Sequence, residues 1–368
     1  MSLTTVDGSL ISSGAITLTT QVTGTLPEAN GGTGTTVGYC GFKNRIINGA
    51  MVIDQRNAGL PVTPNSSTYT LDRWRIGVDT TQRMSFQQVS DAPAGFTNSI
   101  LCTVTTSGST SASNLLYLQQ NIEGFNVSDF GFGTASAQTV SVSFWVKSSI
   151  IGLKSISLIN ASLSRAYCTT YNIDTANTWE YKTVTIPGDT SGTWGTGNGN
   201  GLELHFNFQI GSTYETTLNT WAAGRFYSAS SVPDITTTSG ATINITGVQL
   251  EKGSTATSFD YRPYGTELQL CQRYFQGVQT YFGLKTASGY TRVNIALPVS
   301  MRVSPSISYY DGGGNTSRIS TFSSGDAQTN NRTPIAVAGA SSLQIQILPN
   351  NTDADTGYLF NASMSAEL

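Results

Sequence analysis

Alternation of apolar and polar residues along short segments most constrains what this chain can fold into. Residues 140–147 place four apolar side chains at every second position, and residues 202–210 place five. Successive side chains of a strand point to opposite faces of a sheet, so each segment predicts a strand with one buried face. Two sheets of such strands cover each other's apolar faces, and residues 41–265 therefore predict an antiparallel jelly-roll sandwich.

A single stretch, residues 266–275, predicts an α-helix. Its apolar side chains follow helical spacing at Leu268, Cys271 and Phe275, with Leu270 and Tyr274 on an adjoining row. After it, strand-like segments return. We therefore predict an all-β chain in which a helical connector at 266–276 leads to a smaller C-terminal β-sandwich at 277–368. A short helix that only covers the end of the first sandwich fits the same pattern.

The two apolar rows of this helix carry separate expectations. We expect Leu268, Cys271 and Phe275 to be mostly buried. We expect Tyr274 or Leu270 to lie close to another copy of the chain. If both rows are buried within one chain, the helix is a lid on its own sandwich.

The composition points to a surface of hydroxyl and amide groups. Only 11% of the residues are charged and 38 are glycine, whereas about a quarter of a soluble domain is normally charged. The 10% aromatic content argues against disorder. Such a composition suits an extracellular or virion β protein and surfaces that meet sugars.

Charge and hydropathy exclude several classes of partner. The 19 basic and 22 acidic residues are scattered, which argues against nucleic acid. No apolar run approaches the roughly 18 residues of a membrane span, so we expect no membrane insertion. The first residues lack the features of a signal peptide, so we expect folding in a cytoplasm and four free, buried cysteines. These are Cys40, Cys102, Cys168 and Cys271.

Residues 1–40 cannot build a globular core. Isolated apolar residues alternate there with small polar ones, and a glycine-rich run, NGGTGTT, follows at 30–36. A terminal segment with so few apolar residues is ordered only where it contacts another part of the structure or another chain. We therefore expect an extended N-terminal shaft that intertwines with other copies of the chain or docks on a larger particle.

Several motifs resemble the fibre proteins of tailed bacteriophages. Residues 22–34 (VTGTLPEANGGTG) resemble their N-terminal shaft motif. In those fibres a carbohydrate-binding-like domain follows the shaft. Three segments here resemble the start of that domain: 44–51 (NRIINGAM), 54–57 (DQRN) and 69–75 (YTLDRWR). Further similar motifs are 142–147 (VSFWVK), 245–251 (ITGVQLE), 259–265 (FDYRPYG) and 270–275 (LCQRYF). The resemblance covers about residues 20–275, and the ending 363–368 is also similar.

This resemblance implies a galactose-binding-like jelly roll within a virion fibre. It implies a homotrimer that attaches to other virion proteins by residues 1–40. It further implies recognition of host-surface polysaccharide or lipopolysaccharide by the distal β domains, after assembly in the host cytoplasm. In this family the segment around Trp74 resembles scaffold, and we expect Trp74 to pack in the core while Arg73 and Arg75 pair with carboxylates.

No pattern singles out catalysis or a cofactor. The one histidine, His205, lies within an alternating strand beside no nucleophile motif, so we expect a solvated or hydrogen-bonded histidine rather than a general base. Among 22 acidic residues no pair stands out as the two carboxylates of a glycosidase. Asp353 and Asp355 are weak candidates for calcium, and a polar turn between strands is the favoured interpretation. We predict a protein that is not an enzyme and carries no cofactor.

Sugar binding matches the surface chemistry, because sugar rings stack on aromatic faces while amide, carboxylate and guanidinium groups bind their hydroxyls. Aromatic and polar residues of this kind gather at the predicted tip, in and beside a loop expected at 311–317 and a longer loop expected at 323–332. The candidates there are Tyr309, Tyr310, Asp311, Asn315, Arg318, Phe322, Asp326, Asn330, Asn331 and Arg332. Trp194 and Tyr214 form a second candidate pair on loops of the central domain.

The leading hypothesis is therefore a non-enzymatic virion fibre that binds host glycan at its distal tip. Two alternatives stay open. One is a purely structural virion component, either a capsid-attached fibre or a tail connector. The other is a polysaccharide depolymerase or a free polysaccharide-binding module.

Overall fold

The structure is a computed structural model of the 368-residue chain. It describes residues 42–79, 82–284, 291–311, 313–323, 328–332, 335–347 and 355–368. The chain divides into two units, residues 1–43 and 44–368, and every strand and helix that the structure describes lies in the second unit.

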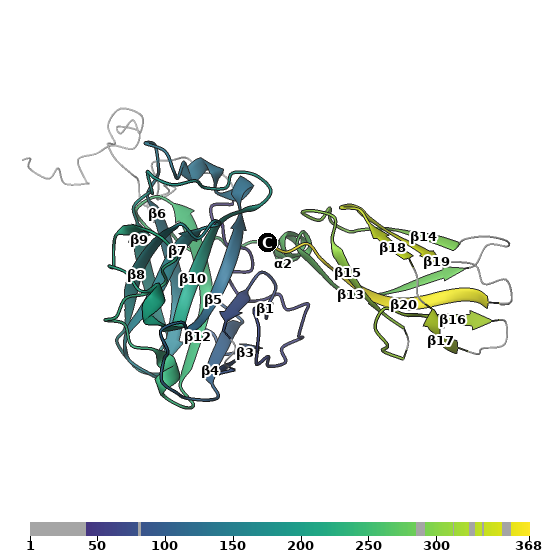
Figure 1. Cartoon of the computed structure of the whole chain (residues 1–368), viewed down its shortest axis with the longest axis horizontal. Helices are drawn as coiled ribbons and strands as arrows, with labels where there is room; N and C mark the ends of the chain where they lie inside the picture. The colour runs from purple at the N-terminus through teal and green to yellow at the C-terminus, as the bar shows by residue number, and fades with distance from the viewer. Residues whose placement is uncertain are drawn as a thin grey trace, which may run out of the picture. The chain divides into compact units, whose positions relative to one another are not determined.

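Two antiparallel sheets face each other between residues 68 and 252 (Figure 1). In the described residues the larger sheet has seven strands, in the order β1 (Thr68–Tyr69), β2 (Arg75–Val78), β5 (Leu115–Glu123), β10 (Asn200–Ile210), β7 (Gly152–Asn160), β8 (Arg165–Ile173) and β11 (Trp221–Ala223). The smaller has five, in the order β3 (Met84–Val89), β4 (Ser99–Val104), β12 (Thr242–Lys252), β6 (Val140–Ser148) and β9 (Glu180–Ile186). Short 3₁₀ turns lie at Gly124–Asn126 (η3), Ser128–Phe130 (η4), Ser212–Tyr214 (η5) and Ile235–Thr237 (η6).

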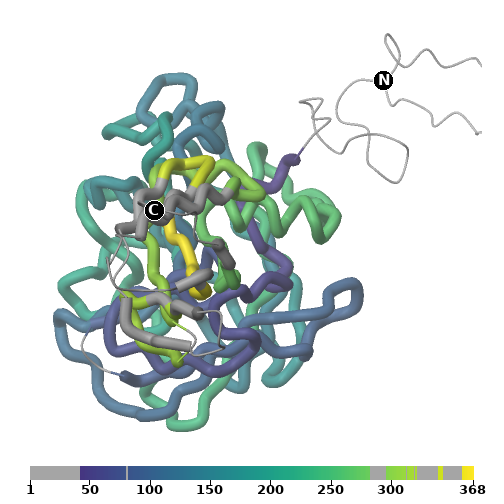
Figure 2. The backbone as a smooth tube through the Cα atoms, turned by 90° about the vertical axis from the view of Figure 1, so that its right-hand side faces the viewer, coloured from purple at the N-terminus to yellow at the C-terminus, as the bar shows by residue number. Residues whose placement is uncertain are grey.

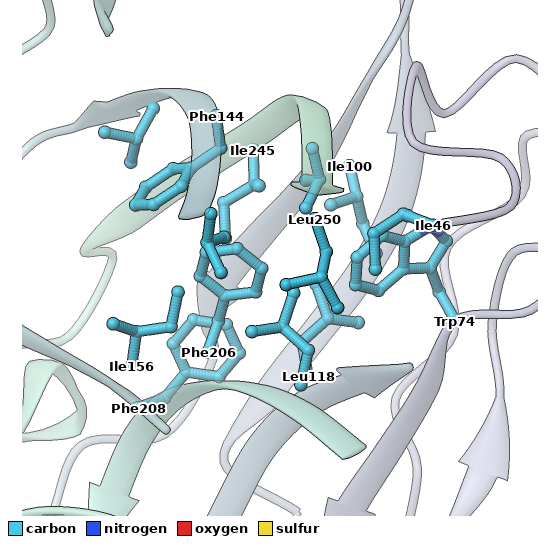
Figure 3. Close-up of a cluster of buried hydrophobic side chains, with 14 of the residues drawn as sticks. Ile46, Trp74, Ile100, Leu118, Phe144, Ile156, Phe206, Phe208, Ile245 and Leu250 are labelled. Carbon is cyan, nitrogen blue, oxygen red and sulfur yellow. The ribbon is translucent and has the colours of Figure 1, made fainter. Parts of the chain in front are cut away.

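The core between these sheets follows from the alternation in the sequence. Phe144 of β6 and Phe206 of β10 point into the space between the sheets, as Figure 3 shows. Their ring centroids lie 5.0 Å apart in an edge-to-face arrangement, a favourable geometry for two aromatic quadrupoles. Phe206 also pairs in register with Leu118 of β5 and Ile156 of β7. The predicted all-β sandwich is confirmed.

Strands β13 to β20 form two further antiparallel sheets. One contains β13 (Phe275–Leu284), β20 (Asp355–Ser365), β16 (Ile319–Ser323), β17 (Gln328–Arg332) and β15 (Ser306–Tyr310). The other contains β14 (Thr291–Ala296), β19 (Ser342–Ile347) and β18 (Ile335–Ala338). Strand β20, yellow in Figure 2, is the centre of its sheet, because β13 pairs with one edge and β15 and β16 with the other.

The helix α2 spans Tyr264–Gln272 and is displaced from the predicted 266–275. It starts earlier because the carbonyl of Pro263 accepts the first helical hydrogen bonds, from Thr266 N at 2.9 Å and Glu267 N at 3.1 Å. It ends earlier because Phe275 already pairs with Ser365 as the first residue of β13. Among the residues that the structure describes, α2 is the one α-helix.

Burial of the helix row is confirmed only in part. Cys271 is wholly buried, whereas Leu268 and Phe275 are half-buried. The Tyr274 side chain is wholly buried in this chain beside Cys271, so it does not supply the contact expected for Tyr274 or Leu270. Leu270 packs partly against the same cluster, and its contact with a second chain stays a prediction.

A buried polar framework holds the first turns of the sandwich in place. The side chain of Asn48 donates to the carbonyls of Ile53 at 2.8 Å and Asp72 at 3.0 Å. The indole of Trp74 donates to the Asn48 carbonyl at 3.0 Å, and the Trp74 side chain is wholly buried. The prediction that Trp74 belongs to the core is therefore confirmed.

The buried guanidinium of Arg73 ties this framework to the far end of the chain. It forms an ion pair with Glu367 and donates to the carbonyl of Asn121 on β5. It also stacks on Tyr274, with its central carbon 3.6 Å from the ring centroid. Arg56 pairs with the other oxygen of Glu367 at 2.6 Å. The prediction of a carboxylate partner is confirmed for Arg73.

Glu367→Gln tests this junction. The substitution leaves the Arg73 charge buried without its acid, and we expect the free energy of unfolding to fall by about 3 kcal/mol. Chemical unfolding at pH 7 measures the change. The control is Asp174→Asn, which breaks the ion pair of a largely exposed carboxylate with Lys182 and should leave stability nearly unchanged. Equal effects of the two substitutions would contradict a structural role for Glu367.

The carboxyl of Asp72 gives the fold a pH dependence of its own. Burial raises its pKa to about 6, although hydrogen bonds from Gln55 and the charge of Arg56 act in the opposite direction. The folded chain therefore holds this proton more tightly than the unfolded chain. Protonation between about pH 6 and pH 4 stabilises the fold, and raising the pH through the same window removes that contribution.

We expect this dependence to disappear in Asp72→Asn. Wild type should gain about 2 kcal/mol relative to the variant as the pH falls from 6 to 4. Urea unfolding of both proteins at several pH values measures the difference, which cancels the titration of all other carboxyls. A constant difference across the window would show that Asp72 titrates at its ordinary pKa.

Candidate functional site

A pocket of about 220 Å³ opens at one end of the sandwich. Three segments distant in the sequence form it: the start of the unit at 44–52, the loop 95–97 before β4, and residues 259–267, which lead from β12 into α2. These segments lie outside the strands, where a rigid sandwich holds loops in fixed positions.

Aromatic side chains form one wall of the pocket. The Phe96 ring lies 5.1 Å from the Phe259 ring and 5.5 Å from the Tyr261 ring, measured between centroids. Tyr261 and Tyr264 are 59% and 62% exposed, so their rings face solvent at the pocket. Two exposed aromatic rings therefore line the same pocket.

Polar side chains also line the pocket and are held by hydrogen bonds to the start of the unit. Arg262 donates to the Ile46 carbonyl at 3.1 Å and pairs with Glu267 at 3.2 Å. Glu267 also accepts from the backbone nitrogen of Asn48. The Asp260 carboxylate accepts from Asn44 N at 3.2 Å. These contacts fix the polar groups in position before any ligand arrives.

The Tyr261 hydroxyl is anchored as well. It donates to the carbonyl of Gly95 at 2.9 Å, and burial raises its pKa above the ordinary value. The ring therefore stands at a defined angle with its hydroxyl protonated at neutral pH. A fixed ring beside fixed amide, carboxylate and guanidinium groups suits an uncharged, hydroxyl-rich ring as ligand.

Two of the predicted site residues at the C-terminal loops, Asp311 and Asn315, hydrogen-bond within their own loop. Asp311 is buried, and its carboxylate accepts from Gly313 N and Asn315 N, each at 2.9 Å. Desolvation opposes the effect, but these bonds and the Asn315 amide hold the pKa of Asp311 below its usual value. Asp311 and Asn315 thus close a turn. Of the aromatic candidates, Tyr309 packs partly against the core around Phe360, and Tyr310 is half-buried.

Other predicted residues of that region are only partly described. Arg318 is exposed on the loop before β16. Asn330, Asn331 and Arg332 lie in β17 and Phe322 in β16, so the predicted long loop is wrong: a polar edge strand pairs there with β16. Side-chain positions of these four residues lie outside the described part, as does Asp326 altogether.

Trp194 and Tyr214 are not brought together. Trp194 packs edge-to-face with Phe132 at 4.9 Å and Trp221 at 5.5 Å beside the main core. Tyr214 packs against a separate cluster around Tyr227 on the outer face of the larger sheet. Both rings are half-buried and take part in packing, and neither lines the aromatic pocket.

His205 is hydrogen-bonded, as predicted. It is wholly buried on β10, and its Nε2 lies 3.0 Å from Glu203 Oε2. Burial lowers the His205 pKa, although Glu203 acts in the opposite direction, so the neutral ring is favoured. Rings of Tyr117 and Tyr227 cover it at 4.7 and 5.0 Å.

The described residues also test the predictions about metal binding, free cysteines and membrane insertion. Within the described ranges no three or more histidine, cysteine or acidic side chains gather where a metal ion could be held. Asp353 and the side chain of Asp355 lie outside those ranges. Cys102, Cys168 and Cys271 are free and buried, as predicted, and Cys40 is not described. No helix in the described part is long and apolar enough to cross a membrane.

Sequence reasoning missed the pocket. The segment 259–264 holds three aromatic residues within six positions and lacks strand alternation, which could have marked an aromatic loop. Phe96 lies more than 160 positions earlier, and no local pattern connects it to that segment.

No protein-family model and no curated protein matches this sequence. Among solved structures, the chain is similar to the enzymatically active domain of tailspike protein 4 of bacteriophage CBA120. The identity is 16%, and the match covers 57% of this chain and 22% of that chain with a TM-score of 0.32.

Two further similar structures are carbohydrate-binding modules. TmCBM61 in complex with β-1,4-galactotriose is 11% identical, covering 57% of this chain and 99% of that chain with a TM-score of 0.29. A family 11 module from Clostridium thermocellum, in complex with a mixed-linked tetrasaccharide, is 14% identical, covering 50% and 91% with a TM-score of 0.27. Because every TM-score is below 0.5, none of these likenesses decides what this chain does.

Proposed function

We propose that this chain binds host-surface glycan, as polysaccharide or lipopolysaccharide, through the aromatic pocket. The observation that carries the proposal is the cluster of Phe96, Phe259 and Tyr261 beside the exposed Tyr264, in a pocket that the paired Arg262 and Glu267 also line. Aromatic faces stack on the C–H faces of sugars, and fixed polar groups select among hydroxyls. The site lies on the sandwich, whereas Asp311 and Tyr309 of the expected tip are engaged within their own domain.

We further propose that the chain is a virion fibre component of a tailed phage, attached to the particle by residues 1–40 and assembled as a homotrimer. The ordered run of fibre-like motifs across residues 20–275 supports this proposal. Three pockets per fibre, and several fibres per particle, would bind a repetitive glycan surface firmly although each pocket binds weakly.

The proposed role is non-enzymatic. A glycosidase needs one carboxyl free to give a proton and a second to act as nucleophile or base. In the pocket Glu267 accepts from Asn48 N and pairs with Arg262, while Asp260 accepts from Asn44 N. Both acids therefore hold the scaffold. Release of reducing sugar from the bound polysaccharide would favour the depolymerase alternative instead.

Tyr264→Ala tests the binding site. Tyr264 is 62% exposed, so we expect nearly unchanged stability and a loss of glycan affinity of about tenfold from the missing ring. Phe125→Ala is the matched control, because Phe125 is also 62% exposed but lies on η3, away from the pocket-lining residues. Binding of full-length proteins to immobilised lipopolysaccharide and capsular polysaccharide of the host, measured by biolayer interferometry, gives the comparison.

Two results would count against the pocket. An equal loss in both variants would indicate a general surface effect, and unchanged binding in Tyr264→Ala would place recognition elsewhere on the chain. If wild type binds neither the isolated glycans nor intact host cells, the structural alternative is favoured. Antibody labelling of the particle would then locate the protein as a capsid-attached fibre or a tail connector.

A further inference from the structure

A row of aromatic rings continues from the pocket across the smaller sheet. Trp145 of β6 is half-buried on the outer face and pairs in register with Tyr181 of β9. Their ring centroids lie 5.5 Å apart. Tyr181 is 44% exposed and lies on β9, an edge strand of the smaller sheet.

Gly247 joins this pair to the pocket. It lies at an irregularity of β12, between Thr246 and Gln249, with φ of +61°. A Cβ added there would lie 2.7 Å from Cζ of Phe96 and 3.1 Å from Cδ1 of Trp145. Both rings therefore reach the same glycine, and only a residue without a side chain permits this approach. The rings of Tyr264, Tyr261, Phe96, Trp145 and Tyr181 form what we call the aromatic strip.

Two cations near the strip are paired with acids. Lys147 forms an ion pair with Asp91, and Asp91 also accepts from the indole of Trp179 at 3.2 Å. The Lys147 ammonium lies over the Trp179 ring at 5.4 Å. At the pocket end, Arg262 pairs with Glu267. A strongly anionic polymer would have to compete with Asp91 and Glu267 for these cations, so the strip favours an uncharged ligand.

We propose that the ligand is an extended, uncharged polysaccharide bound lengthwise along the aromatic strip, with one end of the bound segment in the pocket and several sugar rings stacked toward Tyr181. This inference rests on the proposed function of the pocket and adds the class of ligand: a polymer rather than a terminal sugar. Each ring adds stacking area, so affinity rises with the length of the glycan until the strip is filled.

The test uses fragments of the polysaccharide that wild type binds, prepared by partial acid hydrolysis and separated from monosaccharide to octasaccharide. Isothermal titration of the full chain measures each affinity. We expect affinity to rise with fragment length. Tyr181→Ala should weaken the longest fragments about tenfold and leave the shortest unchanged, whereas Tyr261→Ala should weaken all of them. Tyr181→Phe keeps the ring and should bind as wild type does.

Each other outcome overturns the inference in a distinguishable way. Affinity that is independent of length, or unaltered by Tyr181→Ala, would leave the pocket as a site for a single sugar and the proposed function intact. Failure of wild type to bind any glycan would remove the proposed function itself. A changed assembly mass of Tyr181→Ala in sedimentation, with unchanged affinity, would assign the strip to a contact between copies of the chain. Thermal unfolding of each variant confirms that it is folded.

Discussion

The buried cation of Arg73 is the constraint on which much of this structure depends. Burying a guanidinium costs several kcal/mol unless an acid and hydrogen-bond acceptors surround it. Glu367, the Asn121 carbonyl and the Tyr274 ring supply that environment from three distant parts of the chain. Desolvation acts to lower the Arg73 pKa, but Glu367 reverses the balance and raises it, so the charge is kept. Arg73 itself adopts a left-handed backbone with φ of +69°, a conformation that non-glycine residues rarely take without compensation.

This constraint explains why Asp72, Arg73 and Trp74 occur side by side. Their side chains serve three different neighbours: Asp72 accepts from Gln55 at 2.7 Å, Arg73 meets Glu367, and Trp74 fills the core. The tight turn between β1 and β2 presents all three inward. The same junction buries Tyr274 against the Arg73 guanidinium.

The sandwich could be predicted from the sequence because the alternation of apolar and polar residues in each central strand indicates which face is buried. Residues 140–147 and 202–208 alternate, and both lie in strands whose alternating apolar side chains are buried in the core between the sheets. The helix was displaced because Phe275 has a helical spacing but a better partner in β20. Strand β17 was missed because Gln328–Arg332 is polar throughout. The segment pairs with β16 but has no alternation of apolar and polar residues that would predict a strand.

The pocket could not be predicted in the same way. It needs Phe96 and Phe259 in contact, and that contact exists only after β4 and β12 have paired along Ile100 and Ile245. Asp311, a loop residue predicted to bind glycan, instead accepts hydrogen bonds from the backbone of Gly313 and Asn315. Polar loop residues such as Asp311 form hydrogen bonds within their own turn. The Phe96 ring instead packs at Gly247, which is distant in the sequence, and this contact requires the strands of the smaller sheet to have paired.

The separation of Arg73 from its acid has a consequence for biosynthesis. The two residues are 294 positions apart, so at about 5–20 residues per second the ribosome needs roughly 15–60 s to supply Glu367 after Arg73. During that time the strands of the sandwich have emerged while their buried cation lacks a counter-charge. The nascent sandwich therefore lacks the counter-charge of its buried guanidinium until Glu367 has been synthesised.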